Sequence, residues 1–569
     1  MLLVLAGLAE GIGLAVLLPL LQKFGVGQGA TPSMLQEAIE KTLAFFSIPN
    51  TFGALLLVVV AIMYLQVALQ LGRGWFEADC QTRYTSYWQR RLFDTFINAQ
   101  WMFFASEKAT NRVALIMTQS GRIAAAFFLL TQIITAGVLM AIYASLSLLA
   151  SWQVVVLLAG FAVAIYFALR PLSWRGHAIG ESITVVNEAL QHRATEFIQS
   201  AKLVKATGTE QLAMTLFGAA TENYRAAFRK AGFHSRLVQG VYMIAGYTML
   251  GAGMWATVSY LEVNPSVLLV SIYVFLKLYM QLTNLQQNWQ SMLLSLPAFP
   301  AAMENIERAT AMEERLSGGQ RLPDGPAAIR LKDVTARYGD FVALDRLTLD
   351  MPAGSCIGIT GASGAGKSTL VDIVVGLLKT SGGTVTIDGV LIDDVALRDW
   401  RRSIGYVGQD TLLLNGTVAE NIAWGTKFDL AAIEEAARAA NAHEFIAALP
   451  QGYDTQIGDR GMRLSGGQRQ RLSLARALIG AKRLLILDEA TSALDSESEN
   501  AIMRALAHSR GKITMMVVAH RLSTLRESDE ILVLDKGRVA ERGTWSSLIE
   551  SNGPFARLLE LQDVNKVTA

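Results

Sequence analysis

The chain has 569 residues, more than one ordinary domain needs, so we expect at least two domains. Apolar residues make up 52% of the sequence and charged residues only 17%, which is little charge for a soluble protein of this size. The net charge of +2 argues against a nucleic-acid partner and against a polybasic membrane anchor. The two cysteines, Cys80 and Cys356, are too few for a disulfide framework or a cysteine-based metal site.

Long apolar tracts in the first half of the chain predict six membrane-spanning helices, because a bilayer core needs about 20 apolar residues in a helix. The tracts are Leu2–Gln22, Phe52–Leu71, Ile123–Gln153, Trp152–Leu169, Leu237–Leu261 and Val263–Leu296. The first contains Glu10 and the last contains Lys277 as its single charge. A cleaved signal peptide is the alternative for the first tract, but this tract lacks a basic n-region and a convincing cleavage site.

The basic residues predict the orientation of these spans. The connections 72–122 and 170–236 hold sixteen Lys and Arg residues, against Lys23 and Lys41 in the loop after the first span. The positive-inside rule therefore places both connections, and both termini, in the cytosol. Both connections contain little Pro or Gly, so we expect helices to continue through them.

The composition changes twice in the second half of the chain. Residues 312–327 are rich in charge, Gly and Pro, as is typical of a linker. From Ala328 onward, short β-rich runs alternate with helical segments, which indicates an α/β domain. We therefore divide the chain into a transmembrane domain at 1–311, a linker at 312–327 and a nucleotide-binding domain at 328–569.

A glycine-rich stretch, Gly361-Ala-Ser-Gly-Ala-Gly-Lys-Ser368, follows the predicted strand Cys356–Thr360 and fits the phosphate-loop pattern. Glycines are needed because a Cβ would obstruct the backbone N–H groups that turn inward around phosphates. In this pattern Lys367 places a positive charge at the β- and γ-phosphates, and the Ser368 hydroxyl is placed to ligate Mg²⁺. A plain glycine-rich turn, the alternative, does not account for the Lys-Ser pair directly after a strand.

Two adjacent carboxylates, Asp488 and Glu489, follow the apolar run Leu484–Leu487, which reads as a buried strand. At such a strand end Asp488 would face the metal ion and Glu489 would lie beside the attacking water. An ordinary surface turn could hold the same pair, but the separation from the phosphate loop favours the catalytic interpretation.

The stretch Leu464-Ser-Gly-Gly-Gln468 resembles the signature motif of ABC ATPases, and other elements of that family appear in order around it. Tyr338 resembles the aromatic residue that stacks on adenine, and Gln409 the glutamine that senses Mg²⁺ and the nucleophilic water. Asp495 lies in a loop similar to the one that couples the two ATP sites. His520 resembles the histidine that contacts the γ-phosphate.

The resemblance assigns ATP and Mg²⁺ as cofactors, with Lys367, Gln409, Glu489 and His520 in catalysis. The metal ligands it implies are Ser368, Gln409 and Asp488. The residues assigned to ATP binding are Tyr338, Gly361, Ser363, Gly364, Gly366, Lys367, Ser368, Thr369, Gln409, Ser465, Gly466, Gly467, Gln468, Asp495 and His520.

Six spans with long cytosolic extensions ahead of one such domain resemble an ABC half-exporter. The implied fold is an all-α six-helix transmembrane domain joined to an α/β P-loop NTPase domain. The resemblance further implies a homodimer in which each ATP lies between the phosphate loop of one subunit and Ser465–Gly467 of the other. It implies coupling helices near 101–112 and 207–217. Asp459 stands where Glu is usual in the family, and Gly408 stands where Pro is common.

A second copy of the signature letters, Leu316-Ser-Gly-Gly-Gln320, precedes the phosphate loop. We interpret it as part of the linker. On that interpretation it is an exposed loop, and Gly319→Asp is expected to leave activity within about twofold.

The function predicted from these residues is ATP-driven export or flipping of an amphipathic or lipid-like substrate by alternating access. The alternatives are a multidrug exporter and an ATP-gated channel or regulatory protein, although the intact catalytic residues argue against the latter. The first span, with Glu10 and Pro19, resembles those of bacterial lipid-linked oligosaccharide flippases and polysaccharide exporters. This implies a multi-pass protein of the bacterial inner membrane with membrane lipid around it. Glu10 and Lys277, both near mid-membrane, are predicted to line the translocation path.

Overall fold

The structure, a computed structural model, describes residues 41, 45, 49, 51–106, 109–150, 178–260, 265–316, 318–458, 461–490 and 509–567. The described chain divides into a helical unit, which ends at Glu313, and an α/β unit, which comprises Glu314 onward together with Gln100–Met102. The predicted spans Leu2–Gln22 and Trp152–Leu169 lie outside the described residues, as do Asp459 and Asp495.

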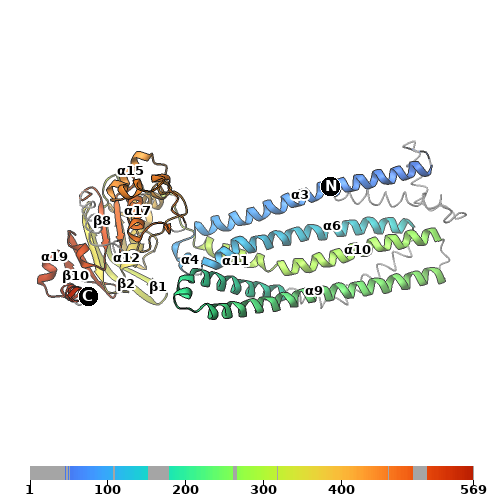
Figure 1. Cartoon of the computed structure of the whole chain (residues 1–569), viewed down its shortest axis with the longest axis horizontal. Coiled ribbons are helices and arrows are strands. Elements are labelled where there is room, and N and C mark those ends of the chain that lie inside the picture. Colours follow the sequence, from blue (N-terminus) through green and yellow to red (C-terminus); the bar gives the residue numbers. More distant parts are fainter. Residues whose placement is uncertain are drawn as a thin grey trace. The chain divides into compact units, whose positions relative to one another are not determined.

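Long helices that run side by side make up the helical unit (Figure 1). The helices are α3 (Phe52–Ile97), α4 (Trp101–Ser106), α5 (Ala109–Ala114), α6 (Ser120–Ala150), α8 (Ala201–Ala206), α9 (Glu210–Tyr260), α10 (Pro265–Ser295) and α11 (Ala298–Ala311), with the π-helical turn η1 (Leu115–Gln119) between α5 and α6. A helix also covers residues 178–199. At 1.5 Å per residue the 51 residues of α9 extend about 77 Å, far more than the ~30 Å hydrocarbon core of a bilayer. The helices therefore continue beyond any membrane, as the sequence predicts for the cytosolic connections.

Apolar side chains cover the outside of the helical unit. Within the described residues, α3 and the helix Thr110–Ser145 are long and apolar enough to cross a membrane, and their apolar 18-residue stretches have mean hydropathies of 2.5 and 2.1. Leu57, Tyr64 and Leu71 on α3 are all more than two-thirds exposed. Exposed apolar surface on this scale is expected where a helix meets lipid.

Lys277, the charge within the last predicted span, lies on α10. Its Nζ atom is 5.6 Å from the centre of the Tyr273 ring one turn earlier, a cation–π contact. Glu10, the other charge predicted to line the translocation path, lies outside the described residues, so the placement of both charges on that path stays a prediction.

A hydrophobic cluster fixes the end of the helical unit nearest to the connection 98–119. It is built by Trp88, Leu92 and Phe96 of α3, Phe103 of α4, and small residues of α11. Arg112 donates to the carbonyl oxygens of Phe103 (3.0 Å) and Phe104 (2.8 Å) at the end of α4. The first predicted coupling segment, 101–112, thus contains two short helices.

The second coupling segment differs from the prediction. The short helix α8 occupies Ala201–Ala206, a turn follows, and the predicted range 207–217 falls mostly on the start of α9. Gly208, with φ of +64°, ends α8, because this left-handed conformation favours glycine. The short helix therefore lies about one to two turns earlier than the sequence suggested.

The α/β unit contains two sheets. One is antiparallel, with β2 (Phe341–Met351), β1 (Ile329–Tyr338), β4 (Gly382–Ile387) and β5 (Val390–Leu391) in that order. The other has the order β10 (Arg538–Gly543), β9 (Glu530–Asp535), β3 (Cys356–Gly361), β8 (Thr514–Val518), β7 (Leu484–Asp488) and β6 (Ile404–Val407). The second sheet is parallel except for the β9–β10 pair. Every residue of β3, β7 and β8 is buried, as expected for parallel strands covered on both faces.

Helices and the antiparallel sheet cover the two faces of the six-stranded sheet. The remaining elements are α12 (Lys367–Val375), η2 (Ile392–Asp394), α13 (Leu397–Arg402), α14 (Val418–Ile422), α15 (Leu430–Ala439), α16 (His443–Ala447), η3 (Gly452–Asp454), α17 (Gly466–Leu478), η5 (Leu522–Leu525), α19 (Trp545–Glu550) and α20 (Pro554–Val567). Alternate residues of each strand belong to two separate hydrophobic clusters. Leu485 and Leu487 pack with α14 and α17, whereas Leu484 and Ile486 pack with β1, β2 and α12. This is the period-two alternation of a β-strand.

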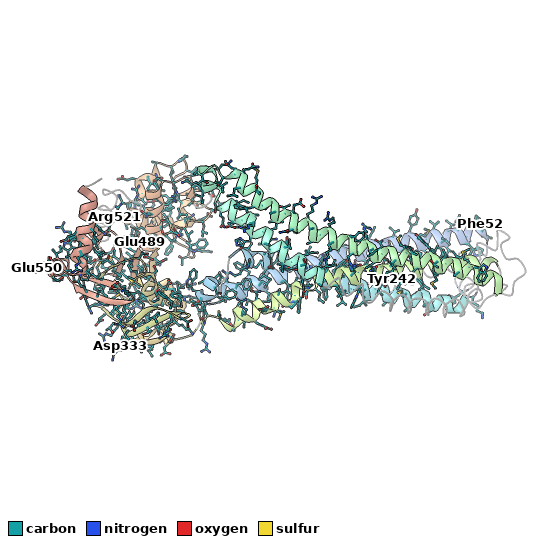
Figure 2. All side chains as sticks on the ribbon, turned by 90° about the horizontal axis from the view of Figure 1, so that it is seen from below. Phe52, Tyr242, Asp333, Glu489, Arg521 and Glu550 are labelled. Atoms are coloured by element: carbon teal, nitrogen blue, oxygen red, sulfur yellow. The ribbon has the colours of Figure 1, made fainter. Side chains whose placement is uncertain are left out.

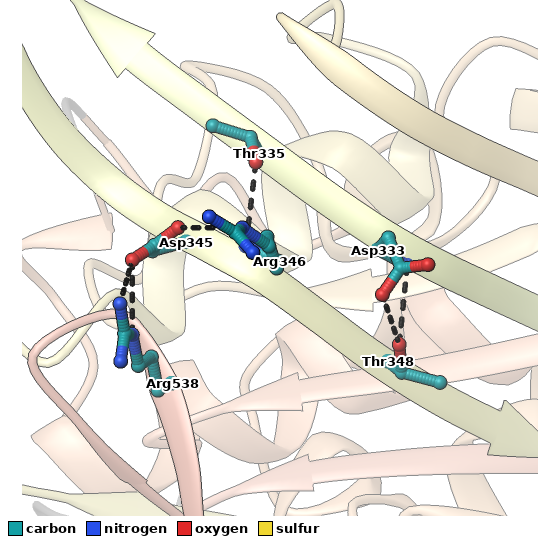
Figure 3. A network of polar contacts seen from close by, with 6 residues as sticks. All are labelled: Asp333, Thr335, Asp345, Arg346, Thr348 and Arg538. Carbon is teal, nitrogen blue, oxygen red and sulfur yellow. Dashed lines mark hydrogen bonds and ion pairs between the residues drawn. The ribbon is translucent and has the colours of Figure 1, made fainter.

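Polar contacts tie the antiparallel sheet to the edge of the parallel one (Figure 3). The Arg538 Nε atom of β10 donates to Asp345 Oδ2 of β2 at 2.9 Å. This guanidinium lowers the pKa of the exposed Asp345 carboxyl. On the adjacent strand the Asp333 N–H donates to the Thr348 hydroxyl at 3.1 Å. The Arg538 contact therefore holds the β1–β2 hairpin against β10, whereas the Asp333 contact lies within the hairpin.

Candidate active site

The phosphate loop lies between the end of β3 and the start of α12. Gly361 has φ of +149°, and a Cβ there would meet the Leu534 carbonyl oxygen at 2.2 Å. Gly366 has φ of +101°, and a Cβ there would meet the Ala343 carbonyl oxygen at 2.7 Å. No other residue fits either position, because the conformation and the close backbone both require glycine. Ser363, Gly364 and Ser368 are exposed along the loop, whereas Thr369 is buried.

Lys367 is the first residue of α12, and its side chain lies across the loop. Its Nζ atom donates to the carbonyl oxygens of Gly361 (2.8 Å) and Ala362 (3.0 Å). Burial lowers the pKa of Lys367, and the nearby carboxylates of Glu489 and Asp488 oppose that shift. The ammonium is thus held where the N-terminus of α12 and the loop N–H groups can bind phosphate.

Glu489 is bound from both sides by residues that are distant in sequence. Gln409 Nε2 donates to Glu489 Oε2 at 2.9 Å, and His520 Nε2 lies 2.7 Å from Glu489 Oε1. The three residues follow β6, β7 and β8, which are neighbours in the parallel sheet, so their C-terminal ends meet at one edge. Glu489 has φ of +53°, a conformation rare for a residue with a Cβ, and such strain is common at functional sites. Figure 2 shows Glu489 within the α/β unit.

Asp488 ends β7 and is buried. Burial raises its pKa, the adjacent Glu489 raises it further, and Lys367 and His520 lower it. Two neighbouring carboxylates, one of them buried, fit a cation, and the oxygens of Asp488, Ser368 and Gln409 are the hard ligands that Mg²⁺ prefers. The residues present therefore suit the metal that the sequence implies.

The sequence analysis missed a third acid close to this site, in addition to Asp488 and Glu489. Asp372 lies on α12, and burial followed by the charge of Asp488 raises its pKa to about 6. Tyr406 of β6 joins the same group, because burial, Asp488 and Asp372 raise its pKa to about 12. The available signal was a single Asp within the apolar run of α12, Leu370–Val375.

The predicted signature residues begin α17. Ser465 is the N-cap of this helix: its hydroxyl accepts from the Gln468 N–H at 3.3 Å, and Gln468 Oε1 accepts from the Ser465 N–H at 2.9 Å. Gly466 and Gly467 form the first turn, and a Cβ at Gly466 would meet open space. Tyr338 ends β1 and is partly buried. It packs against the hydrophobic cluster that contains Leu484 and Ile486.

The linker copy of the signature is exposed at Gly318, Gly319 and Gln320, as the sequence predicts, but it is docked against the segment around Val395. Gln320 forms a parallel bridge with Val395, and its N–H donates to the Asp394 carbonyl oxygen at 2.7 Å. Gly319 has φ of +91°, and a Cβ there would lie 2.6 Å from the Val395 carbonyl carbon. Even a methyl group at Gly319 has no room, so Gly319→Asp is expected to strain the docking of the linker on Val395. Its small effect on activity stays a prediction.

The fold and the site define a P-loop ATPase domain joined to a helical membrane unit. Residues 344–492 match the sequence model of the family described as "ABC transporter". An ATP-dependent lipid A-core flippase of Saccharophagus degradans is 39% identical over 381 residues, which cover 66% of this chain and 64% of the relative. The protein of the same name from Cupriavidus metallidurans is 30% identical over 554 residues, 94% of this chain and 91% of the relative.

A solved structure is similar over the full length. It is titled as a bacterial Atm1-family ABC exporter with ATP bound, is 26% identical, and covers 99% of this chain and 97% of its own, with a TM-score of 0.84. The chain belongs to the ABC transporter family. It is a membrane exporter whose ATPase domain binds ATP and is coupled to transport.

Proposed function

We propose that the protein is an ATP-driven flippase that moves a lipid-like amphipathic substrate out of the inner leaflet of a bacterial inner membrane. The single observation that carries the ATP-driven part is the convergence of Gln409 and His520 on Glu489, beside the Lys367 loop. The lipid-like substrate is supported by the flippases to which the chain is similar. In this assignment residues 1–311 are the transmembrane domain, 312–327 the linker and 328–569 the nucleotide-binding domain.

In the proposed hydrolysis Glu489 accepts the proton of the attacking water. Gln409, which holds one Glu489 oxygen, orients that carboxylate and the water. His520 holds the other oxygen, and its exposed imidazole is placed to contact the γ-phosphate. Lys367 and the loop N–H groups bind the phosphates and stabilise negative charge. Ser368, Asp488 and Gln409 would hold Mg²⁺, which would supply charge neutralisation at the phosphate oxygens.

The remaining ATP contacts are assigned by resemblance. Tyr338 stacks on adenine, and Gly361, Ser363, Gly364, Gly366 and Thr369 surround the phosphates. Ser465–Gln468 act from a second copy of the chain, so that two subunits form a homodimer with two composite sites. Asp495 joins the two sites. The Ser465 hydroxyl caps its own helix. In this proposal the N-terminus of that helix meets the partner's nucleotide.

Reconstitution into liposomes tests this function. The protein is placed in vesicles that contain a fluorescent phospholipid analogue, a lipid-linked glycan or no added substrate, and the accessibility of the label to an external quencher is followed with and without MgATP. We expect ATP-dependent movement of a lipid analogue, and none in Glu489→Gln vesicles. Stimulation of ATPase activity and transport by soluble drugs alone, with no lipid movement, would favour the multidrug alternative.

A further inference from the structure

The C-terminal end of the phosphate-loop helix α12 is held by side chains from another segment. A helix leaves its last four carbonyl groups without helical partners. In α12 the Asp372 and Ile373 carbonyls accept from the N–H groups of Leu377 (2.8 Å) and Gly376 (3.0 Å), which follow the helix. The next carbonyls depend on α13. Trp400 Nε1 donates to Val374 at 3.0 Å, and its ring is 1% exposed.

Arg401 completes this cap. Its Nε atom donates to the Val375 carbonyl oxygen at 3.3 Å, and Nη2 donates to the Gly376 carbonyl oxygen at 2.6 Å. A guanidinium at this end of a helix also opposes the negative pole of the helix dipole. Every carbonyl at the end of α12 is therefore satisfied, two of them by one arginine.

The same guanidinium binds a linker carboxylate. Arg401 Nη1 donates to Glu314 Oε2 at 2.7 Å, and Nη2 donates to Glu314 Oε1 at 2.5 Å. This is a bidentate pair, and the two side chains are only 22% and 14% exposed. Pairs of this geometry are stronger and more directional than the exposed ion pairs on the same unit. Glu314 lies three residues after the end of α11, in the segment that carries the linker copy of the signature.

We propose that Arg401 is a positioning residue for nucleotide binding, which ties the linker carboxylate of Glu314 to the C-terminal end of α12. Helix α12 begins at Lys367 and ends at Val375, so it is a rigid body of nine residues with the phosphate-binding ammonium at one end and the Arg401 cap at the other. Fixing one end of so short a helix fixes the direction of the other. Movement of the linker would reach Lys367 through Glu314, Arg401 and the helix. This inference uses ATP binding alone and does not depend on the proposed substrate.

Nucleotide affinity of the full-length protein tests the proposal, with the melting temperature of each variant measured with and without ATP. In Arg401→Ala we expect the Kd of a fluorescent ATP analogue to rise roughly tenfold, the effect of losing about one charge-assisted hydrogen bond. The rise in melting temperature on adding ATP should shrink accordingly. Arg401→Lys, which keeps a charge at the helix end, should fall between wild type and Arg401→Ala. Arg330→Gln breaks an exposed pair with Asp350 on β1 and β2 and is the matched control, expected within about twofold of wild type.

The variant Glu314→Gln distinguishes the two roles of Arg401, because it removes the ion pair with the linker and keeps the hydrogen bonds that cap α12. It leaves Arg401 on the α12 carbonyls, so we expect a smaller rise in Kd, about threefold. The exchanged pair Glu314→Arg with Arg401→Glu can restore the ion pair, but it places a carboxylate at the carbonyl end of α12. We therefore expect no recovery of affinity. Wild-type affinity in Arg401→Ala, an equal loss in Arg330→Gln, or full recovery in the exchanged pair would each overturn the proposal. If Arg401→Ala does not fold, Arg401→Lys and the exchanged pair decide the question.

Discussion

The Nε2 atom of His520 lies 2.7 Å from Oε1 of Glu489, and this contact joins the ends of two adjacent strands. Half of the His520 side chain is exposed, whereas the Glu489 side chain is 12% exposed. The carboxylate is therefore enclosed, whereas half of the imidazole faces solvent. This difference in exposure suits a histidine that contacts a bound phosphate and a glutamate that acts on water.

Glu489→Gln should abolish ATP hydrolysis while ATP still binds. The amide keeps the shape of the side chain but cannot accept a proton, and the loss of a general base typically removes a factor of about 10² to 10⁴. Only one of its two polar atoms can accept the hydrogen bond from Gln409 Nε2, so the NH₂ group must face His520, which then has to accept at Nε2. Phosphate release and the binding of a fluorescent ATP analogue measure the two properties separately.

Glu530→Gln is a suitable control for this variant, because Glu530 is a carboxylate in the same sheet that pairs with Arg542 at 2.5 Å, away from the loop. Turnover in that variant should stay near wild type. Near-normal turnover in Glu489→Gln would contradict the assignment of Glu489 as the base.

Asp372→Asn should raise the melting temperature at pH 7.5 and have little effect below about pH 4. Burial and Asp488 raise the Asp372 pKa from 3.8 to about 6. The folded protein therefore holds this proton more tightly than the unfolded chain does. The resulting stability is fully present below about pH 4 and is lost as pH rises through about 6. The amide of the variant mimics the protonated acid and does not ionise. The variant therefore keeps at high pH the stability that the wild type loses when Asp372 ionises.

Melting curves between pH 4 and 8, recorded without Mg²⁺ and nucleotide, test this expectation. Asp399→Asn, an exposed carboxylate on α13, serves as the control. A difference between Asp372→Asn and wild type that is constant over this pH range would show that Asp372 does not titrate there.

Gly318 and Gly319 should respond differently to alanine, although both have positive φ, +95° and +91°. A Cβ at Gly318 meets nothing within 4 Å, so Gly318→Ala carries only the backbone strain, about 1 kcal/mol. A Cβ at Gly319 lies 2.6 Å from the Val395 backbone, so Gly319→Ala should cost about 1–3 kcal/mol more. Thermal unfolding of the two variants gives the comparison. Equal melting temperatures would show that the linker is not docked on Val395.

The sequence predicts those parts of the site whose residues are neighbours along the chain. The phosphate loop, the strand before it and the acidic end of β7 are each continuous stretches with their own residue preferences. The sheet order β8-β7-β6, which brings Gln409, Glu489 and His520 together, depends on contacts between distant segments and was available only through family resemblance. Arg401 and Glu314 are 87 residues apart, and neither belongs to a recognisable pattern. The short helix α8 was misplaced because Gly208, which ends it, looks like any glycine in a polar stretch.

Gly467→Asp should abolish hydrolysis without weakening the binding of ATP to the phosphate loop of the same chain. Gly467 lies in the first turn of α17, and a carboxylate there would repel the γ-phosphate that this helix end is proposed to meet across the dimer. Lys367→Ala has the opposite defect: its phosphate loop is damaged and its signature is intact. Neither variant alone should hydrolyse ATP.

In mixed dimers the phosphate loop of the Gly467→Asp subunit faces the signature of the Lys367→Ala subunit, so one of the two ATP sites is complete. We expect co-expressed and co-purified mixed dimers, isolated with two different tags, to recover part of the wild-type turnover. A site formed within one chain would give no recovery, and that result would contradict the composite dimer.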